Sequence, residues 1–235
     1  MAFKIAMSAG HGLNTPGKRC LKKLDNNETR EWVLNNRIAD KIEALLTEYT
    51  GYELLRLDDT TGAVDVPLKQ RTDAANAFNA NLYLSIHANA GIKGGKGGGI
   101  EAYVYTTVSD ETVAWQEDLY NELIKATGLV GNRAKPINRA NLHECRESNM
   151  PAVLLELGYM DSSVDVPIIL SEEFANKCAE AIPGVLVRRG NLVKREEKEL
   201  YRVQVGAYIK KANAEAMRAK LRAAGFNAYI TRQSR

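Results

Sequence analysis

Apolar and polar positions follow two different periods along the first 187 residues of the chain. Short apolar runs, typical of strands buried on both faces, alternate with stretches in which apolar residues recur at helical spacing. The predicted strands are 3–10, 52–57, 82–89, 99–106 and 151–159, and the predicted helices are 29–49, 67–80, 110–127 and 172–187. This alternation is typical of an α/β fold, so we expect a mostly parallel central sheet flanked by helices on both faces.

The pattern changes at the charged segment 188–199, RRGNLVKREEKE, which has little core-forming content and is predicted to be a linker. Beyond it, residues 200–209 and 226–232 alternate like strands, and 213–225 has apolar residues at helical spacing before a glycine stop. We therefore expect a first domain at 1–187 and a small C-terminal β-α-β unit at 200–235.

Composition narrows the class of protein. With 235 residues, of which 45% are hydrophobic, the chain can bury the core of one ordinary domain and a small second one. The formal charge of +3 is too small to indicate nucleic-acid binding, but it suits an anionic surface such as a bacterial wall. Membrane insertion is not expected, because no run approaches the ~20 apolar residues of a spanning helix.

Two further features bear on the compartment. The N-terminal residues enter a predicted strand at once, without the organisation of a signal peptide, so production in the cytoplasm is expected. The three cysteines, Cys20, Cys145 and Cys178, are an odd number without C-x-x-C spacing. They are predicted to be free thiols rather than a disulfide framework or a cysteine zinc site.

Candidate chemistry lies at the ends of three predicted strands. KIAMSAGHG presents His11, LYLSIHANA presents His87, and PAVLLELGY presents Glu156. A lone histidine beside an apolar run is more often structural than functional. Parallel neighbouring strands, however, would bring all three side chains to the same rim of the sheet, where ligands of α/β proteins gather.

Glu31 is the candidate third ligand of a metal site. A hydrolytic zinc commonly takes two histidines and one carboxylate and leaves its fourth position to water. In the predicted helix that begins near residue 29, Glu31 lies on the same face as Leu34, Ile38 and Ile42, and a carboxylate on an inward face is costly to bury unless it is paired or bound to metal. The alternative is a first-turn glutamate that only caps the helix.

Several motifs also resemble a known family. SAGHG, EWVLNNRIA, LYLSIHANA and MPAVLLELGYMDSSVD, in this order, are similar to the motifs of the zinc-dependent N-acetylmuramoyl-L-alanine amidases of the amidase family 3 type, and the resemblance extends over nearly all of residues 3–187. It implies Zn²⁺ as cofactor, with His11, Glu31 and His87 as ligands and Glu156 as the catalytic carboxylate. The implied reaction is hydrolysis of the amide bond between N-acetylmuramic acid and L-alanine in peptidoglycan.

Three other residues are candidate substrate contacts. Arg71 matches an arginine of the family, although a structural ion pair is an equally good interpretation. His143, in NLHECRES, is predicted to be a loop residue more often than a ligand, and Asn89 would help to shape the rim beyond His87.

The C-terminal unit resembles half of a SPOR domain, a domain that binds peptidoglycan glycan strands, most clearly in YRVQVGAY and AGFNAYI. A full domain of that kind has two such halves. The single half could pair with a second copy in a homodimer, pack on the catalytic domain, belong to a fragment, or be an extension that binds nothing.

Two other functions remain open at this point: a catalytically silent peptidoglycan-binding protein, and a zinc peptidase that acts within the stem peptide. For the amidase, the expected N-terminus suggests a phage endolysin released through a membrane pore, or a sporulation amidase freed when the mother cell lyses.

Overall fold

The protein is described from a computed structural model, which covers residues 2–196 and 203–232. The chain divides into two compact units, Met1–Arg195 and Glu196–Arg235, which are considered separately. Among the described residues, no helix is both long and apolar enough to span a membrane.

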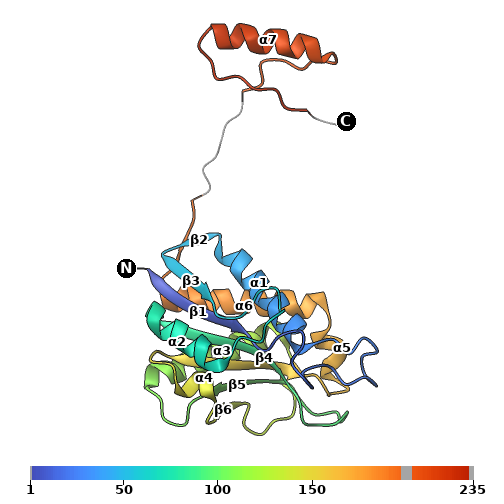
Figure 1. The fold of residues 1–235 in the computed structure, drawn as a ribbon, viewed down its shortest axis with the longest axis vertical. Coiled ribbons are helices and arrows are strands. Elements are labelled where there is room, and N and C mark those ends of the chain that lie inside the picture. The colour runs from blue at the N-terminus through green and yellow to red at the C-terminus, as the bar shows by residue number, and fades with distance from the viewer. Residues whose placement is uncertain (1, 197–202, 233–235) are drawn as a thin grey trace. The chain divides into compact units, whose positions relative to one another are not determined.

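The first unit is built on a six-stranded sheet with the order β3-β1-β4-β7-β5-β6 (Figure 1). Four adjacent strands run parallel, namely β3 (Tyr52–Arg56), β1 (Phe3–Ala9), β4 (Leu82–Asn89) and β7 (Ala152–Tyr159). β5 (Ile100–Val104) is antiparallel to β7, and β6 (Ile137–Arg139) is parallel to β5. The predicted α/β class and mostly parallel sheet are confirmed.

Helices cover both faces of the sheet. α6 (Glu172–Gly190) packs against both α1 (Glu31–Leu46) and α3 (Asp110–Thr127), and α1 lies on β4 while α3 lies on β5. The shorter α2 (Leu68–Phe78) and α4 (His143–Arg146) pack together and contact β1 and β7, while α5 (Asp165–Ile169) contacts β7. Ile5 and Met7 belong to one core and Ala6 to the other, because successive strand residues point to opposite faces.

The three cysteines are buried free thiols, as predicted. β1, β4 and β7 lie side by side and run in the same direction, so side chains at their carboxyl ends meet at one edge of the sheet.

The end of the first unit differs from the prediction. Residues 188–195, expected to be linker, continue α6 to Gly190 and then form β8 (Val193–Lys194), which pairs with β2 (Tyr49–Thr50). The charged segment can pack on the first unit because the Arg189 guanidinium pairs with Asp118 at 2.7 Å and lies over the Trp115 ring.

The C-terminal unit also departs from its predicted β-α-β form. Its described part, residues 203–232, contains the helix α7 (Lys211–Ala223) and no strand, and the helix has no buried residue. Residues 200–202 of the first predicted strand lie outside the described part of the chain. A strand requires a pairing partner, and two short segments around one exposed helix have no apolar layer to hold them together.

Candidate metal centre

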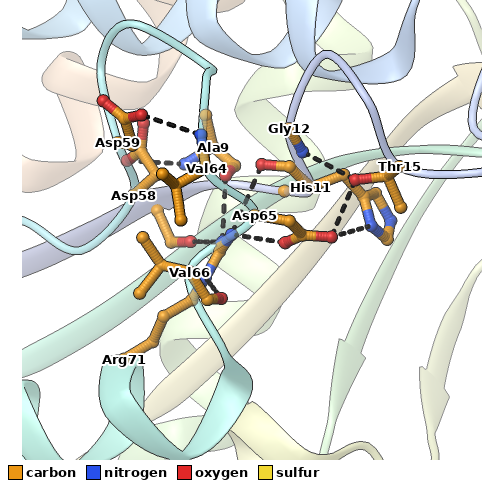
Figure 2. Close-up of polar contacts among 12 residues, drawn as sticks. Ala9, His11, Gly12, Thr15, Asp58, Asp59, Val64, Asp65, Val66 and Arg71 are labelled. Carbon is orange, nitrogen blue, oxygen red and sulfur yellow. Dashed lines mark hydrogen bonds and ion pairs between the residues drawn. The ribbon is translucent and has the colours of Figure 1, made fainter.

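His11 follows β1 in a sharp turn that Arg71 holds in place. Its backbone is left-handed, with φ 67°, a conformation that non-glycine residues adopt rarely. The Arg71 guanidinium donates to the carbonyls of Ala9 at 3.0 Å and His11 at 3.4 Å, and also to the Ser8 hydroxyl (Figure 2). Because this arginine is 1% exposed, its contacts favour the structural interpretation over a substrate contact.

Asp65 supports the same turn from the loop before α2. One of its oxygens lies 3.3 Å from the Arg71 guanidinium. The other accepts a hydrogen bond from the Thr15 hydroxyl at 2.7 Å and lies 3.9 Å from Nδ1 of His11 (Figure 2). The imidazole of His11 therefore has a carboxylate behind one ring nitrogen, while its other nitrogen faces the interior of the site.

His87 comes from β4, the strand adjacent to β1. Its ring lies edge-on to that of His11, with 5.0 Å between the centroids, and directly over Gly10. A Cβ added to Gly10 would lie 2.2 Å from Cε1 of His87, so only glycine leaves room for the imidazole. This contact explains why the first residue of the GHG segment is a glycine.

Glu31 is the first residue of α1 and joins the two histidines. One carboxylate oxygen lies 3.0 Å from Nδ1 of His87 and accepts from the Ala88 backbone N–H at 3.2 Å. The other oxygen lies 3.5 Å from Nε2 of His11. All three residues offer a ligand atom within 4.8 Å of the others. The structure thus brings the three predicted ligands together.

The charges of this cluster are strongly coupled. Burial lowers the pKa of His11 to about 4, although Glu31 opposes the effect. Burial would also lower the pKa of His87, but Glu144 and Glu31 raise it to about 10. For Glu31, burial is outweighed by His87, His11 and Lys18, and its pKa falls below the ordinary value. The group therefore holds a buried carboxylate in its ionised form.

The polar atoms of the cluster fit a cation. Oε2 of Glu31 is buried and has no hydrogen-bond partner among the described residues. Apart from the histidines, the positive charge that pairs with Glu31 among the described residues is the Lys18 ammonium, which is 3.6 Å from Oε2 and partly exposed. Two imidazoles and one ionised carboxylate on separate elements are a typical donor set for a divalent metal.

Glu156 lies beside this cluster on β7. It is in register with His87 on one neighbouring strand and with Glu101 on the other. Burial raises its pKa to about 7, and its Oε2 has no hydrogen-bond partner in the described part of the chain. It lines a cavity of about 330 Å³ together with Lys18, Asn89 and Met160. The Glu156 side chain therefore borders the cavity, and its pKa lies where the carboxylate could exchange a proton near neutral pH.

Of the other two predicted substrate contacts, one lies at the cavity and the other lies outside the metal cluster. Asn89 lines the cavity and donates to Glu101 at 2.9 Å. His143 begins α4, with Nε2 3.4 Å from the Thr72 hydroxyl, and is not part of the metal cluster. A substrate contact by either residue stays a prediction.

Two buried glutamates at the site were not predicted. Glu101 accepts from Asn89, Tyr159 and Tyr103 behind the cavity. Glu144 receives hydrogen bonds from Tyr83 and Ser85. Although burial disfavours the charged form of Glu144, its contacts with His87 and Tyr83 lower its pKa to about 2. The signal that could have indicated Glu144 is the polar series Tyr83, Ser85 and His87 at every second position of an apolar strand.

Comparison with known proteins agrees with this geometry. Residues 5–187 match the family model described as N-acetylmuramoyl-L-alanine amidase, and residues 190–235 match the SPOR domain model. The chain belongs to this amidase family. The match confirms the family predicted from the motifs and the predicted function, an amidase that hydrolyses the cell wall.

Individual relatives cover most of the chain. A sporulation-specific N-acetylmuramoyl-L-alanine amidase of Bacillus subtilis is 35% identical over 97% of this chain and 84% of its own length. The N-acetylmuramoyl-L-alanine amidase CwlM of Bacillus licheniformis is 34% identical over the same shares. The solved catalytic domain of CwlV, an amidase from Bacillus (Paenibacillus) polymyxa, superimposes with a TM-score of 0.71 at 27% identity over 81% of this chain and 99% of that domain.

The predicted location is wrong. The SPOR match and the sporulation-specific relative point to a role at the cell wall. Cytoplasmic production, with release through a phage pore or by mother-cell lysis, rests only on the absence of signal-peptide organisation. The N-terminal residues form β1, which tells how this segment folds and nothing about where the protein acts.

Proposed function

We propose that this amidase is a zinc enzyme that cleaves the bond between N-acetylmuramic acid and L-alanine, with His11, Glu31 and His87 as the metal ligands and Glu156 as the general base and acid. The observation that carries the proposal is the convergence of two histidines and an ionised glutamate within 4.8 Å of one another, beside a cavity that a fourth, unpartnered carboxylate lines.

The ligand cluster suits zinc chemistry. Zinc bound there would lower the pKa of water to near 7 and polarise the scissile carbonyl. Two ligands come from the ends of adjacent strands and one from the first turn of a helix, so rigid elements would hold the metal.

Glu156 would carry the proton. Its pKa of about 7 suits a group that accepts a proton from the attacking water and then returns it to the departing L-alanine amine. The same carboxylate therefore serves as base and then as acid, and no second titratable group is required for the transfer.

The C-terminal residues would attach the enzyme to its substrate. We propose that the catalytic domain, predicted as 1–187, extends through β8 to residue 195, and that residues 200–235 form a unit that binds glycan strands, a role that the SPOR match over 190–235 supports. A homodimer through this unit stays a prediction, which light scattering of the purified chain would test.

Product analysis after incubation with purified peptidoglycan tests the proposal. The expected products are new L-alanine amino termini and glycan strands of unchanged length. Other new amino termini would identify a peptidase that acts within the stem peptide. Sedimentation with peptidoglycan but no release of peptide would identify a silent binding protein, against which the complete set of four side chains argues.

A further inference from the structure

Three side chains of one strand meet a single buried carboxylate. Tyr83, Ser85 and His87 alternate along β4 and therefore point to the same face of the sheet. Oε1 of Glu144, from α4, accepts a hydrogen bond from the Tyr83 hydroxyl at 2.5 Å, and Oε2 accepts one from Ser85 at 3.1 Å. Glu144 is 3% exposed, so these donors fix its carboxylate away from solvent.

His87 lies between this carboxylate and the ligand cluster. Its Nδ1 faces Glu31 at 3.0 Å, and its Nε2 faces Oε2 of Glu144 at 3.6 Å. That second separation is an ion-pair distance slightly beyond a hydrogen bond, and Nε2 has no hydrogen-bond partner among the described residues. A shift of a few tenths of an ångström would convert the contact into a hydrogen bond.

This arrangement has a chemical consequence. An imidazole that binds a metal through one nitrogen carries its proton on the other, and a carboxylate behind that proton selects the tautomer and orients the ring. The polar series on β4 supplies such a carboxylate in a fixed position. Tyr83 and Ser85 satisfy its other lone pairs and prevent it from turning toward the metal site.

We propose that Glu144 is a positioning residue that holds the proton of His87 on Nε2 and thereby presents Nδ1 to the metal. The inference rests on the metal site of the proposed function and adds a residue outside the ligand set. Asp65 lies behind Nδ1 of His11 in the same sense, but at 3.9 Å and with 43% of its side chain exposed, so its contribution is smaller.

Zinc affinity separates positioning from support of the fold. Zinc affinity is measured by competition with a chromophoric chelator, and the thermal midpoint of unfolding is measured on the metal-free protein. Both measurements are made on the wild type, Glu144→Gln, Asp65→Asn and Tyr83→Phe. Glu144→Gln should bind zinc about 10- to 100-fold more weakly. Asp65→Asn should lose less. Tyr83→Phe, which removes a partner of the same carboxylate without touching His87, should lose the least.

Two results would overturn the inference. Unchanged zinc affinity in Glu144→Gln would leave Glu144 a merely structural residue, most plainly if Glu144→Gln and Tyr83→Phe lowered the metal-free midpoint equally. If the wild type does not bind zinc, the proposed metal site is overturned as well. If the wild type binds zinc and Glu144→Gln binds it equally tightly, only the role of Glu144 is overturned.

A second measurement needs no substitution and stands even if Glu144→Gln does not fold. In the zinc-loaded wild-type protein, ¹⁵N chemical shifts and couplings of the His87 ring should place the proton on Nε2. A proton on Nδ1, with Nε2 bound to the metal, would contradict the role of Glu144.

Discussion

Glu31 and Glu156 are two glutamates of one site whose surroundings shift their pKa values in opposite directions. Burial disfavours the charged form of both. Glu31, however, faces His87, His11 and Lys18, and its pKa is lowered. Glu156 has one oxygen without a hydrogen-bond partner among the described residues, and its pKa rises to about 7. The partners of each glutamate, rather than the residue type, therefore decide which carboxylate can hold a metal and which can move a proton.

The regions around the two glutamates differ in the same way. The ligand region is closed by polar side chains that face its histidines, with Asp65 behind His11 and Glu144 behind His87. The proton-transfer region opens into the cavity, and the charge facing Glu156 from β5 is another carboxylate, Glu101.

The largest effect is expected for Glu156→Gln. The amide cannot accept a proton, so kcat should fall by about 10²- to 10⁴-fold while zinc binding is retained. Release of L-alanine amino termini and zinc content are the measurements. Glu173→Gln, on the exposed surface of α6, is the matched control and should behave like the wild type. Normal turnover by Glu156→Gln would refute its role.

Gly10→Ala tests the packing of the ligand region. The added Cβ would lie 2.2 Å from the buried His87 ring, so the ring must leave the position in which its Nδ1 faces Glu31 at 3.0 Å. We expect zinc affinity to fall by at least about tenfold, comparable to the loss of an orienting partner.

Gly184→Ala, in α6, is the control for this change, because a Cβ there meets nothing within 4 Å. Wild-type zinc affinity in Gly10→Ala would show that the GHG turn tolerates a side chain next to His87.

Zinc binding should also release a proton. At pH 7 the metal-free protein holds His11 neutral, because its pKa is about 4, and His87 protonated, because its pKa is about 10. Since a ligating imidazole must give up its proton at the metal-binding nitrogen, about one proton should leave per zinc bound, and affinity should rise about tenfold per pH unit below the pKa of His87. Calorimetry in two buffers of different ionisation enthalpy measures the release. If the number of protons released per zinc is near zero at pH 7, Glu31 and Glu144 do not hold His87 in its charged form.

The smallest effect is expected for Lys18→Ala. The Lys18 ammonium is 3.6 Å from Glu31 and partly exposed, so it competes weakly with a cation for that carboxylate. Its removal should raise zinc affinity by a few-fold, in keeping with the small energy of an exposed ion pair. Weaker zinc binding in this variant would show instead that Lys18 supports the site.

Much of the site could be predicted from the sequence, because strand ends and helix faces are local patterns. His11, His87 and Glu156 each end an apolar run, and the helical spacing placed Glu31 on the inward face. Glu144 could not be found in this way, since its role depends on α4 packing against β7 and facing β4, far away in sequence. Arg71 matches an arginine of the family, but only the structure shows that its guanidinium donates its hydrogen bonds to backbone carbonyls of the turn after β1.

The C-terminal unit shows what the periodicity of apolar residues alone cannot predict. The pattern located a helix correctly, and α7 covers Lys211–Ala223, but the alternating segments on both sides do not form strands in the described residues. Alternation gives a segment one apolar face, whereas a strand also needs neighbours for its backbone hydrogen bonds.

The most direct test of the two glutamate roles is the zinc content of Glu31→Gln and Glu156→Gln after identical purification. About one zinc per chain is expected in the wild type and in Glu156→Gln, and little or none in Glu31→Gln, with release of L-alanine amino termini strongly reduced in both variants. Full zinc content in Glu31→Gln, or loss of zinc in Glu156→Gln, would contradict the assignment of one carboxylate to the metal and the other to the proton.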